Sequence, residues 1–223
     1  MKDRFALLDT PNDTNVLDFN SDGGLQSFRG TLGTNDLSYG AVYYPSLNTV
    51  MRYQISEEST FGTDKFSKLK SDGSEDYQKG LDYAQARPIG IPAAAFLAGV
   101  CAKIARTKGV WNAPANVSLA GVVSPAVTIS AAQQESLNID ANGGKSINAI
   151  RAFAGKGVMV WGARTLAGNS NEWRYISVRR FFVNVEESVA KACDQFVFAP
   201  NDANTWVNVS SMISSYLQGL WHD

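Results

Sequence analysis

The stretch GKGVMVWGARTLAGNSNEWRYISVRRFFVNVEESV, residues 155–189, carries most of the information about the fold. Trp161 and Trp173 supply large side chains that we expect to be buried. Three glycines permit tight turns and a close approach of backbone segments: Gly155, Gly157 and Gly162. This part of the stretch therefore predicts closely packed strands and turns.

Three arginines in the same stretch, Arg164, Arg179 and Arg180, can fix loops through carboxylate or carbonyl contacts. The functional alternative is an arginine-lined pocket for an anionic substrate. No base, nucleophile or metal ligand accompanies the arginines in the sequence, so a structural role is the better interpretation.

Periodicity predicts the elements around this stretch. Three strand candidates are INAIRAF (147–153), GVMVWGA (157–163) and WRYISVRRFF (173–182). A helix follows, with Phe182, Val185 and Val189 on one face and charged residues on the other. QFVFAP (195–200) reads as a strand. Asn201 or Asp202 caps a last helix, whose apolar stripe is typical of core packing: Trp206, Val209, Ile213, Tyr216 or Leu217, and Leu220.

The first half of the chain has the pattern of an α/β protein. RFALLD (4–9) reads as a strand buried on both faces, and YGAVYYP (39–45) as a core strand that Pro45 ends. A helix begins near Pro92, is buried on most sides and closes at Gly109.

Two further segments complete this outline. The polar segment 46–87 is expected to be a surface insertion with a short hairpin. Ser130 can cap a short helix over residues 131–138.

The segment NGGKSINAI (142–150) contains GGKS, which raises the question of a phosphate loop. A Walker A loop needs a glycine five positions before the GK pair, and Ile139 stands there. A helix should follow, whereas INAIRAF is strand-like. We therefore interpret GGKS as a glycine turn that enters a strand, without a nucleotide.

Composition excludes several classes of function. The 20 basic and 21 acidic residues nearly cancel and form no basic cluster, which argues against nucleic acid and anionic lipid as partners. The longest apolar run, residues 93–102, is too short for membrane insertion. Cys101 and Cys193 suit reduced thiols, and the single histidine, His222, lies near the end of the sequence. Triad chemistry and the usual zinc sites need a histidine in a cleft or a cysteine cluster, so we expect no enzyme, metal or cofactor.

The stretch 155–189 closely resembles the C-terminal domain of contractile tail sheath proteins, found in phage tails, tailocins and phage-like injection systems. That family shows G(R/K)G-x-x-VWGARTL, then W-(R/K)-Y-(I/V)-x-VRR, then a helix beginning (I/V)E-x-S(I/V), and all three follow in order here. INAIR, FAPND and GVWNAPAN are similar to neighbouring family segments. DRFALLD, YGAVYYP and the helix after Pro92 resemble the sheath core domain and its linking helix.

The resemblance implies an α/β, mixed α+β architecture with two parts. Residues 1–108 would be part of a subtilisin-like α/β sheath core domain that carries the insertion at about 46–87. Residues 109–223 would be a compact α+β sheath C-terminal domain. The family's extended N- and C-terminal arms, which add strands to neighbouring subunits, have no counterpart here. The chain would be either truncated or a natural short homologue.

For function, the resemblance implies a structural subunit that assembles helically around an inner tube and contracts to drive the tube through a target envelope. Its partners would be other sheath subunits, in hexameric rings when full length, and the inner tube protein. It would belong to a virion tail or phage-like particle assembled in the bacterial cytoplasm. The alternative is a non-contractile adaptor or baseplate-type binding module built on the same domain.

The resemblance also implies that the C-terminal domain faces the tube. We expect the polar face of the helix near residue 186 to make that contact, through Glu186, Glu187, Lys191 and Asp194.

Overall fold

A five-stranded mixed sheet lies at the centre of the protein. The computed structural model describes residues 3–11 and 24–222. In spatial order the strands are β1 (Ala6–Asp9), β2 (Gly40–Tyr44), β9 (Ile147–Phe153), β10 (Gly157–Val160) and β7 (Val117–Ser118). The first three are parallel, whereas β10 pairs antiparallel with β9 and with β7. The prediction of a mixed α/β fold is confirmed.

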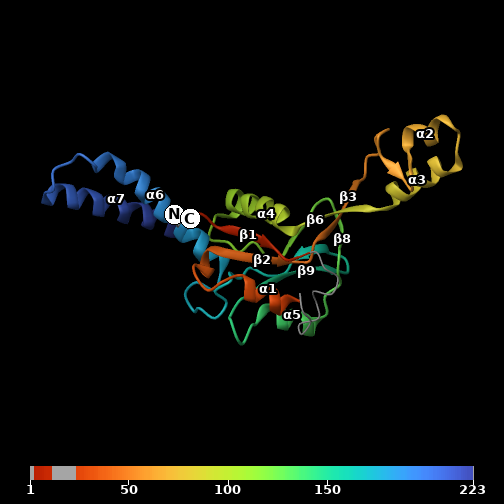
Figure 1. Cartoon of the computed structure of the whole chain (residues 1–223). Helices are drawn as coiled ribbons and strands as arrows, with labels where there is room; N and C mark the ends of the chain where they lie inside the picture. The colour runs from red at the N-terminus through yellow and green to blue at the C-terminus, as the bar shows by residue number, and fades with distance from the viewer. Residues whose placement is uncertain (1–2, 12–23, 223) are drawn as a thin grey trace.

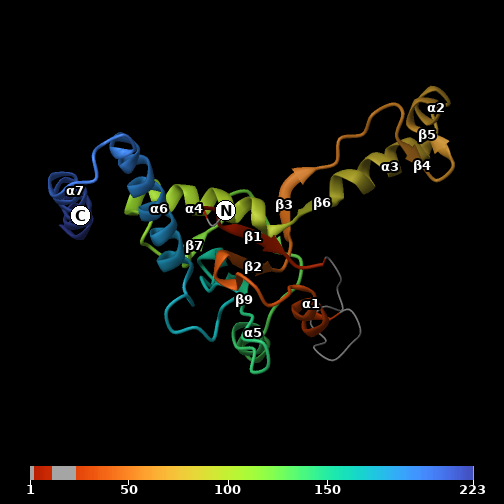
Figure 2. The same cartoon turned by 60° about the vertical axis from the view of Figure 1, so that its left-hand side comes forward.

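Helices cover both faces of this sheet (Figures 1 and 2). α4 (Ala93–Lys108) lies on one face, and α1 (Leu25–Thr31) and α5 (Ala131–Asn138) lie on the other. Both layers bury apolar surface against the strands, which is the usual arrangement for parallel strands in an α/β protein.

Alternation along β2 divides the core in two. Ala41 and Tyr43 pack with α4, whereas Val42 and Tyr44 pack with α1 and α5. Successive side chains of a strand point to opposite faces of a sheet, so all five residues of this strand are buried. The prediction of a core strand at residues 39–45 is confirmed.

β1 differs from its prediction. It begins at Ala6 and its residues are exposed or half-buried, so the expectation of a strand buried on both faces is wrong. The reason is its place at the edge of the sheet, where β2 is its single strand neighbour among the described residues. Asp9 at its end accepts a hydrogen bond from the backbone N–H of Ala94 (2.8 Å), which ties β1 to the beginning of α4.

α4 begins directly after Pro92 and ends before Gly109, whose φ of 93° suits glycine. Both boundaries were predicted. Its buried residues form one face only: Ala93, Leu97, Val100, Cys101 and Ile104. The expectation of burial on most sides is therefore wrong, because α4 covers the sheet as an outer layer.

The predicted cap of α5 is confirmed. The Ser130 hydroxyl accepts from the backbone N–H of Gln133 (3.3 Å), and the Gln133 side chain accepts from the backbone N–H of Ser130 (2.8 Å). This reciprocal capping box satisfies two N–H groups at the helix start.

GGKS forms the predicted turn before β9, with Gly144 at a φ of 69°. Lys145 is buried, and its ammonium donates to the backbone oxygen of Arg29 (2.6 Å). The guanidinium of Arg29 in turn donates to the backbone oxygens of Lys145, Ser136 and Leu137 (2.9, 2.9 and 2.7 Å). This network joins α1, the end of α5 and the glycine turn.

Asp140 completes that network. Its carboxylate lies 4.0 Å from the Arg29 guanidinium, and both side chains are only 4% exposed. Burial raises the pKa of Asp140, but the backbone N–H donors of residues 145, 143 and 142, together with the Arg29 charge, outweigh burial and hold the pKa below its ordinary value. Asp140 is therefore ionised at neutral pH.

A second, three-stranded antiparallel sheet continues into the polar insertion. Its strands are β6 (Pro88–Ile91), β3 (Leu47–Arg52) and β8 (Val122–Pro125). Residues 53–87, here named the distal module, connect β3 to β6 and project away from the body (Figure 1).

The distal module contains the predicted hairpin and two helices that the polar sequence did not indicate. Its elements are β4 (Thr60–Phe61), β5 (Asp64–Lys65), α2 (Phe66–Ser71) and α3 (Glu75–Ala86). Phe66 and Leu69 are buried in it, and the Phe66 ring packs edge-on against Phe61 and Tyr77. The aromatic residues scattered through this segment thus form a small core of their own.

Two predicted strands in the last third of the chain are wrong. Residues 173–182 do not form a strand, because α6 (Ile176–Cys193) begins within them. QFVFAP is not a strand either, and the 3₁₀ turn η3 (Asp194–Phe196) occupies its start. The last helix, α7 (Ala203–His222), begins as predicted after Asp202, whose carboxylate accepts from the backbone N–H of Thr205 (2.8 Å).

The predicted division between residues 108 and 109 stays a prediction. The central sheet takes β1 and β2 from one side of that position and β9, β10 and β7 from the other. The helical hairpin formed by α6 and α7 projects at the end of the molecule opposite the distal module (Figure 2).

Candidate functional site

The helical hairpin leaves most of its surface to solvent. Of α6, only Ile176 and Arg179 are buried, and none of the described residues of α7 is buried. A helix pair that extends from the body with so little burial is held mainly at its base. The remainder of the hairpin is available for contacts with another molecule.

The four residues expected to contact the tube lie along this hairpin. Lys191 donates to the Glu187 carboxylate one turn earlier (2.6 Å), and both side chains are at least half exposed. This hydrogen bond, with the charge of Glu187, raises the pKa of Lys191. Asp194 begins η3, close to the distal tip of the hairpin.

Glu186 has a different environment from its neighbours. Its carboxylate accepts from the Arg179 guanidinium two turns earlier on α6 (3.1 Å). Half of the Glu186 side chain is exposed, but its charge is directed toward the base of the hairpin. The structure thus places Glu187, Lys191 and Asp194 along the free part of the hairpin and links Glu186 to the anchor.

Arg179 is that anchor. Its side chain is 5% exposed, and its guanidinium carbon lies 4.3 Å from the ring centres of both Tyr39 and Trp173. Tyr39 belongs to the 3₁₀ turn η2 (Leu37–Tyr39), just before β2. Two aromatic faces and one carboxylate therefore hold a single buried cation. This arrangement fixes the first turn of α6 on the body.

Arg180 makes a second connection. Its guanidinium donates to the backbone oxygen of Cys101 in α4 (3.2 Å). Burial raises the pKa of the Cys101 thiol, and it raises the pKa of the Tyr43 hydroxyl far above its ordinary range. Both groups stay protonated at neutral pH, so they contribute packing and no nucleophile.

Gly162 and Arg164 lie around a side chain that the sequence analysis missed. The buried amide of Asn148 accepts from the backbone N–H of Arg164 (2.7 Å) and donates to the backbone oxygens of Arg164 and Val42 (2.8 and 3.0 Å). A Cβ at Gly162 would lie 2.7 Å from the Asn148 amide oxygen, so this position requires glycine. The sequence feature that could have revealed Asn148 is its polar side chain within an otherwise apolar strand.

The two tryptophans of the motif are less buried than expected. Trp161 is 39% exposed, so the expectation of a largely buried side chain is wrong for it. Its ring lies against Phe153 across the β9–β10 pair, with the ring centres 4.6 Å apart. Trp173 is half-buried and packs edge-on against Phe182 of α6. Both tryptophan rings lie at the edge of the core, so one side of each ring packs on a phenylalanine and the rest is partly exposed.

The apolar stripe of α7 is also not core, which corrects the prediction. Parts of it pack against α6, where Met212, Ile213 and Tyr216 line a small apolar groove of about 280 Å³. Other large apolar side chains of the hairpin are exposed: Val197, Phe198, Trp206, Val207, Leu217 and Trp221. Phe198 is completely exposed. A concentration of exposed apolar side chains marks an interaction surface.

Within residues 3–11 and 24–222, no group of three or more His, Cys, Asp or Glu side chains is placed to hold a metal ion. Over the same residues no helix has the length and apolar character needed to cross a membrane.

Comparisons with known proteins agree with the resemblance to tail sheath proteins. A family model described as the phage tail sheath protein central domain matches residues 1–166. The tail sheath protein of Vibrio phage KVP40 is 28% identical over 152 residues, which are 67% of this chain and 22% of that protein. The tail sheath protein of Enterobacteria phage T4 is 26% identical over 132 residues, 58% of this chain and 19% of that protein.

Solved structures give the same result over nearly the whole chain. The contracted sheath complex of the extracellular contractile injection system PVC contains a chain that is 31% identical, with a TM-score of 0.71 over 98% of this chain and 48% of that one. The baseplate of the anti-feeding prophage AFP contains another, also 31% identical, with a TM-score of 0.68 and 45% of that chain covered. The present chain thus spans about a fifth of the curated relatives and under half of the solved chains.

Proposed function

Because the chain belongs to the phage tail sheath protein family, we propose that it is a structural subunit of a contractile sheath. In this proposal the sheath assembles helically around an inner tube and contracts to drive the tube through a target envelope. The match of residues 1–166 to the family model and the similarity to a contracted sheath support it. The relatives are components of phage tails or contractile particles, and we propose assembly in the bacterial cytoplasm.

The observation that carries the proposal is the exposed helical hairpin. Large apolar side chains such as Phe198 and Trp221 are left in solvent, which costs free energy unless a partner covers them. Other sheath subunits, in hexameric rings, and the inner tube are the partners that we propose. Contraction then requires no catalysis, since rigid subunits that reorient into a better buried lattice release free energy by themselves.

We propose that the tube contact uses the free part of the hairpin. Glu187, Lys191 and Asp194 are exposed there, and charges at an interface contribute mainly to orientation and choice of partner. Glu186 contributes less directly, because its carboxylate is bonded to Arg179. Its replacement would disturb the anchor as well as the surface, so it is a poor test of the contact.

The test reverses the two acidic charges that are not involved in the anchor. The full-length gene product with Glu187→Lys and Asp194→Lys, co-expressed with its tube protein, is expected to lose assembly on the tube in negative-stain electron microscopy. Its Tm is expected to stay within about 2 °C of the unchanged protein, because exposed substitutions shift stability little.

The matched control reverses two charges outside the hairpin, with Glu57→Lys and Glu75→Lys in the distal module. This control is expected to form striated tubes. Normal decoration of the tube by the Glu187→Lys, Asp194→Lys protein would contradict the assignment of the contact.

A second candidate function is a non-contractile adaptor of the baseplate. The similarity to a chain in the AFP baseplate favours it. The same microscopy separates the two, because an adaptor would remain as small particles with or without the tube protein, whereas a sheath subunit forms helical tubes.

A further inference from the structure

A hollow lies at the base of the distal module, where α3 ends and the chain returns to β6. It has a volume of about 520 Å³ and is lined by Asn48, Tyr53, Tyr83, Ala84, Arg87 and Pro88. The lining combines two phenols, an amide and a guanidinium with the small apolar surfaces of Ala84 and Pro88. Volumes of 300–1,000 Å³ are typical of small-molecule sites.

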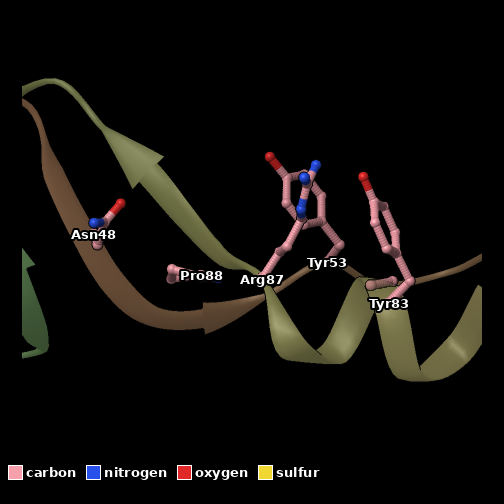
Figure 3. Close-up of a pocket in the computed structure, with 6 residues that line it drawn as sticks. Asn48, Tyr53, Tyr83, Arg87 and Pro88 are labelled. Carbon is pink, nitrogen blue, oxygen red and sulfur yellow. The ribbon is translucent and has the colours of Figure 1, made fainter. Parts of the chain in front are cut away.

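Both tyrosines of this hollow are about half exposed to solvent. Figure 3 shows Tyr53, Tyr83 and Arg87 projecting to the same side of the ribbon. The two tyrosines are 54% and 52% exposed, respectively. The guanidinium carbon of Arg87 lies 4.3 Å from the centre of the Tyr83 ring, so a cation–π contact holds the charge beside the aromatic surface.

Arg87 differs from every other cation of the distal module. Each lysine there has a carboxylate within ion-pair distance: Lys65 with Glu58, Lys68 with Asp64, Lys70 with Glu57, and Lys79 with Glu75 and Asp76. Within the described part of the chain, no ion pair joins Arg87 to a carboxylate. The hollow therefore contains a positioned guanidinium with its hydrogen-bond donors available for an anion.

We propose that this hollow is a binding site for a carboxylated saccharide. The carboxylate is bound by the Arg87 guanidinium, which the Tyr83 ring holds in place, and the C–H face of the sugar ring packs on Tyr53. Asn48 donates its amide N–H to the Ser124 hydroxyl (3.1 Å), which leaves the amide oxygen as the acceptor for a sugar hydroxyl.

Other ligand classes use this set of groups less well. An aliphatic chain would leave the Arg87 guanidinium without a partner, which is costly once water is removed. A free phosphate would satisfy Arg87 and leave the aromatic faces unused. A ring with both a carboxylate and C–H faces satisfies both kinds of group at once.

The place of the hollow suits contact with material outside an assembled particle. The distal module lies at the end of the molecule opposite the helical hairpin (Figure 1). If the hairpin faces the tube as proposed above, the hollow lies on the outer surface. That statement of location rests on the proposed function, whereas binding of a saccharide by the chain itself does not.

The test measures binding of hexagalacturonate to the 223-residue chain by isothermal titration calorimetry. We expect a Kd of about 1 mM or tighter. Fully methyl-esterified hexagalacturonate, which lacks the charge, and hexaglutamate, which lacks the sugar rings, are expected to bind at least about tenfold more weakly. Equal affinity for hexaglutamate would overturn the saccharide assignment, and so would undetectable binding of hexagalacturonate at 10 mM ligand, a concentration of about ten times the expected Kd.

Variants locate the site. Arg87→Ala and Tyr83→Ala should each weaken binding about tenfold or more, and Arg87→Lys should weaken it by a smaller factor because the planar fork is lost and the charge is kept. Tyr83→Phe keeps the ring that packs on Phe61 and should retain binding, which separates loss of the site from loss of the fold. Lys79→Ala removes a charge from the same module outside the hollow, and an equal loss of affinity in this control would overturn the proposal.

Discussion

Arg179 shows at the residue scale how one side chain can fix a helix to a domain. The cation is almost completely buried. It lies between the aromatic rings of Tyr39 and Trp173 and donates to the carboxylate of Glu186. Lysine could not replace these contacts, because a guanidinium is planar and stacks on rings as well as donating hydrogen bonds. Both arginines of the motif thus have contacts within the chain, since Arg180 donates to the backbone of α4.

The buried pair of Asp140 and Arg29 predicts a pH dependence of stability. The lowered pKa of Asp140 means that the native state binds this proton less readily than the unfolded chain does. Its stabilising contribution is fully present above the unfolded-state pKa of about 4 and is lost as the pH falls through the lower native-state value.

Asp140→Asn tests this dependence. At pH 7 the variant should lower the free energy of unfolding by about 3 kcal/mol, because it leaves the Arg29 charge buried without its partner. Urea unfolding followed by tryptophan fluorescence should show a constant difference from pH 7 to pH 5 and a shrinking one below about pH 4. The exposed Glu172→Gln is the control and should change little at any pH. A difference for Asp140→Asn that persists undiminished at pH 3 would contradict this account.

At the scale of elements, α6 shows why local patterns misled. WRYISVRRFF is rich in β-branched and aromatic residues, which favour strands. No strand of the described sheets lies beside it, and residue 175 makes only an isolated bridge to residue 164 before the helix begins. The helical spacing of Phe182, Val185 and Val189 indicates the helix. The same face extends back to Arg179 and Ile176, which are the buried residues of α6.

The distal module depends on one close helix contact. A Cβ at Gly80 would lie 2.5 Å from the tip of the Phe66 ring, which is buried and enclosed by Phe61 and Tyr77. Gly→Ala inside a helix normally stabilises by up to about 1 kcal/mol. Here the overpacking should dominate and destabilise the module by about 1–3 kcal/mol.

Gly80→Ala can be compared directly with Gly99→Ala in α4, where an added Cβ meets nothing within 4 Å. Hydrogen exchange should show faster exchange over residues 60–86 for Gly80→Ala and unchanged protection of the central sheet. Gly99→Ala should stabilise the protein slightly. Equal protection of the distal module in both variants would disprove the packing argument.

On the scale of the whole molecule, the body has a core between two helical layers, whereas its two projections have little core of their own. The helical hairpin leaves Phe198 completely exposed and Trp221 87% exposed. If these side chains serve contacts with other molecules, their replacement should affect assembly and leave folding unchanged.

The triple substitution Phe198→Ser, Val207→Gln and Trp221→Gln tests this expectation. The free energy of unfolding should change by less than about 1 kcal/mol, because little buried surface is lost. Sheath assembly of the full-length gene product should be lost in electron microscopy. The buried Leu97→Ala is the control for folding and should cost about 2–5 kcal/mol. A triple variant that assembles normally would show that these side chains are not part of the interface.

The sequence by itself indicated the family, a strand within each of the segments 39–45, 147–153 and 157–163, the two ends of α4, and the N-terminal caps of α5 and α7. The last of these strands, β10, ends at Val160, three residues earlier than predicted. These features depend on local chemistry, such as a capping serine, a proline, glycines in turns and runs of apolar residues, so neighbours in the chain suffice to indicate them.

Only the tertiary structure decided which apolar residues lie inside. Trp161 and the stripe of α7 have the same composition as core segments, but burial depends on which distant segments pack against them. The sequence also could not predict that Arg179 pairs with Glu186 or that Arg87 lies against Tyr83, because side-chain contacts are set by the packing of whole elements. The physical reason is that exposure and pairing are properties of the assembled core, whereas turns and caps are properties of a few consecutive residues.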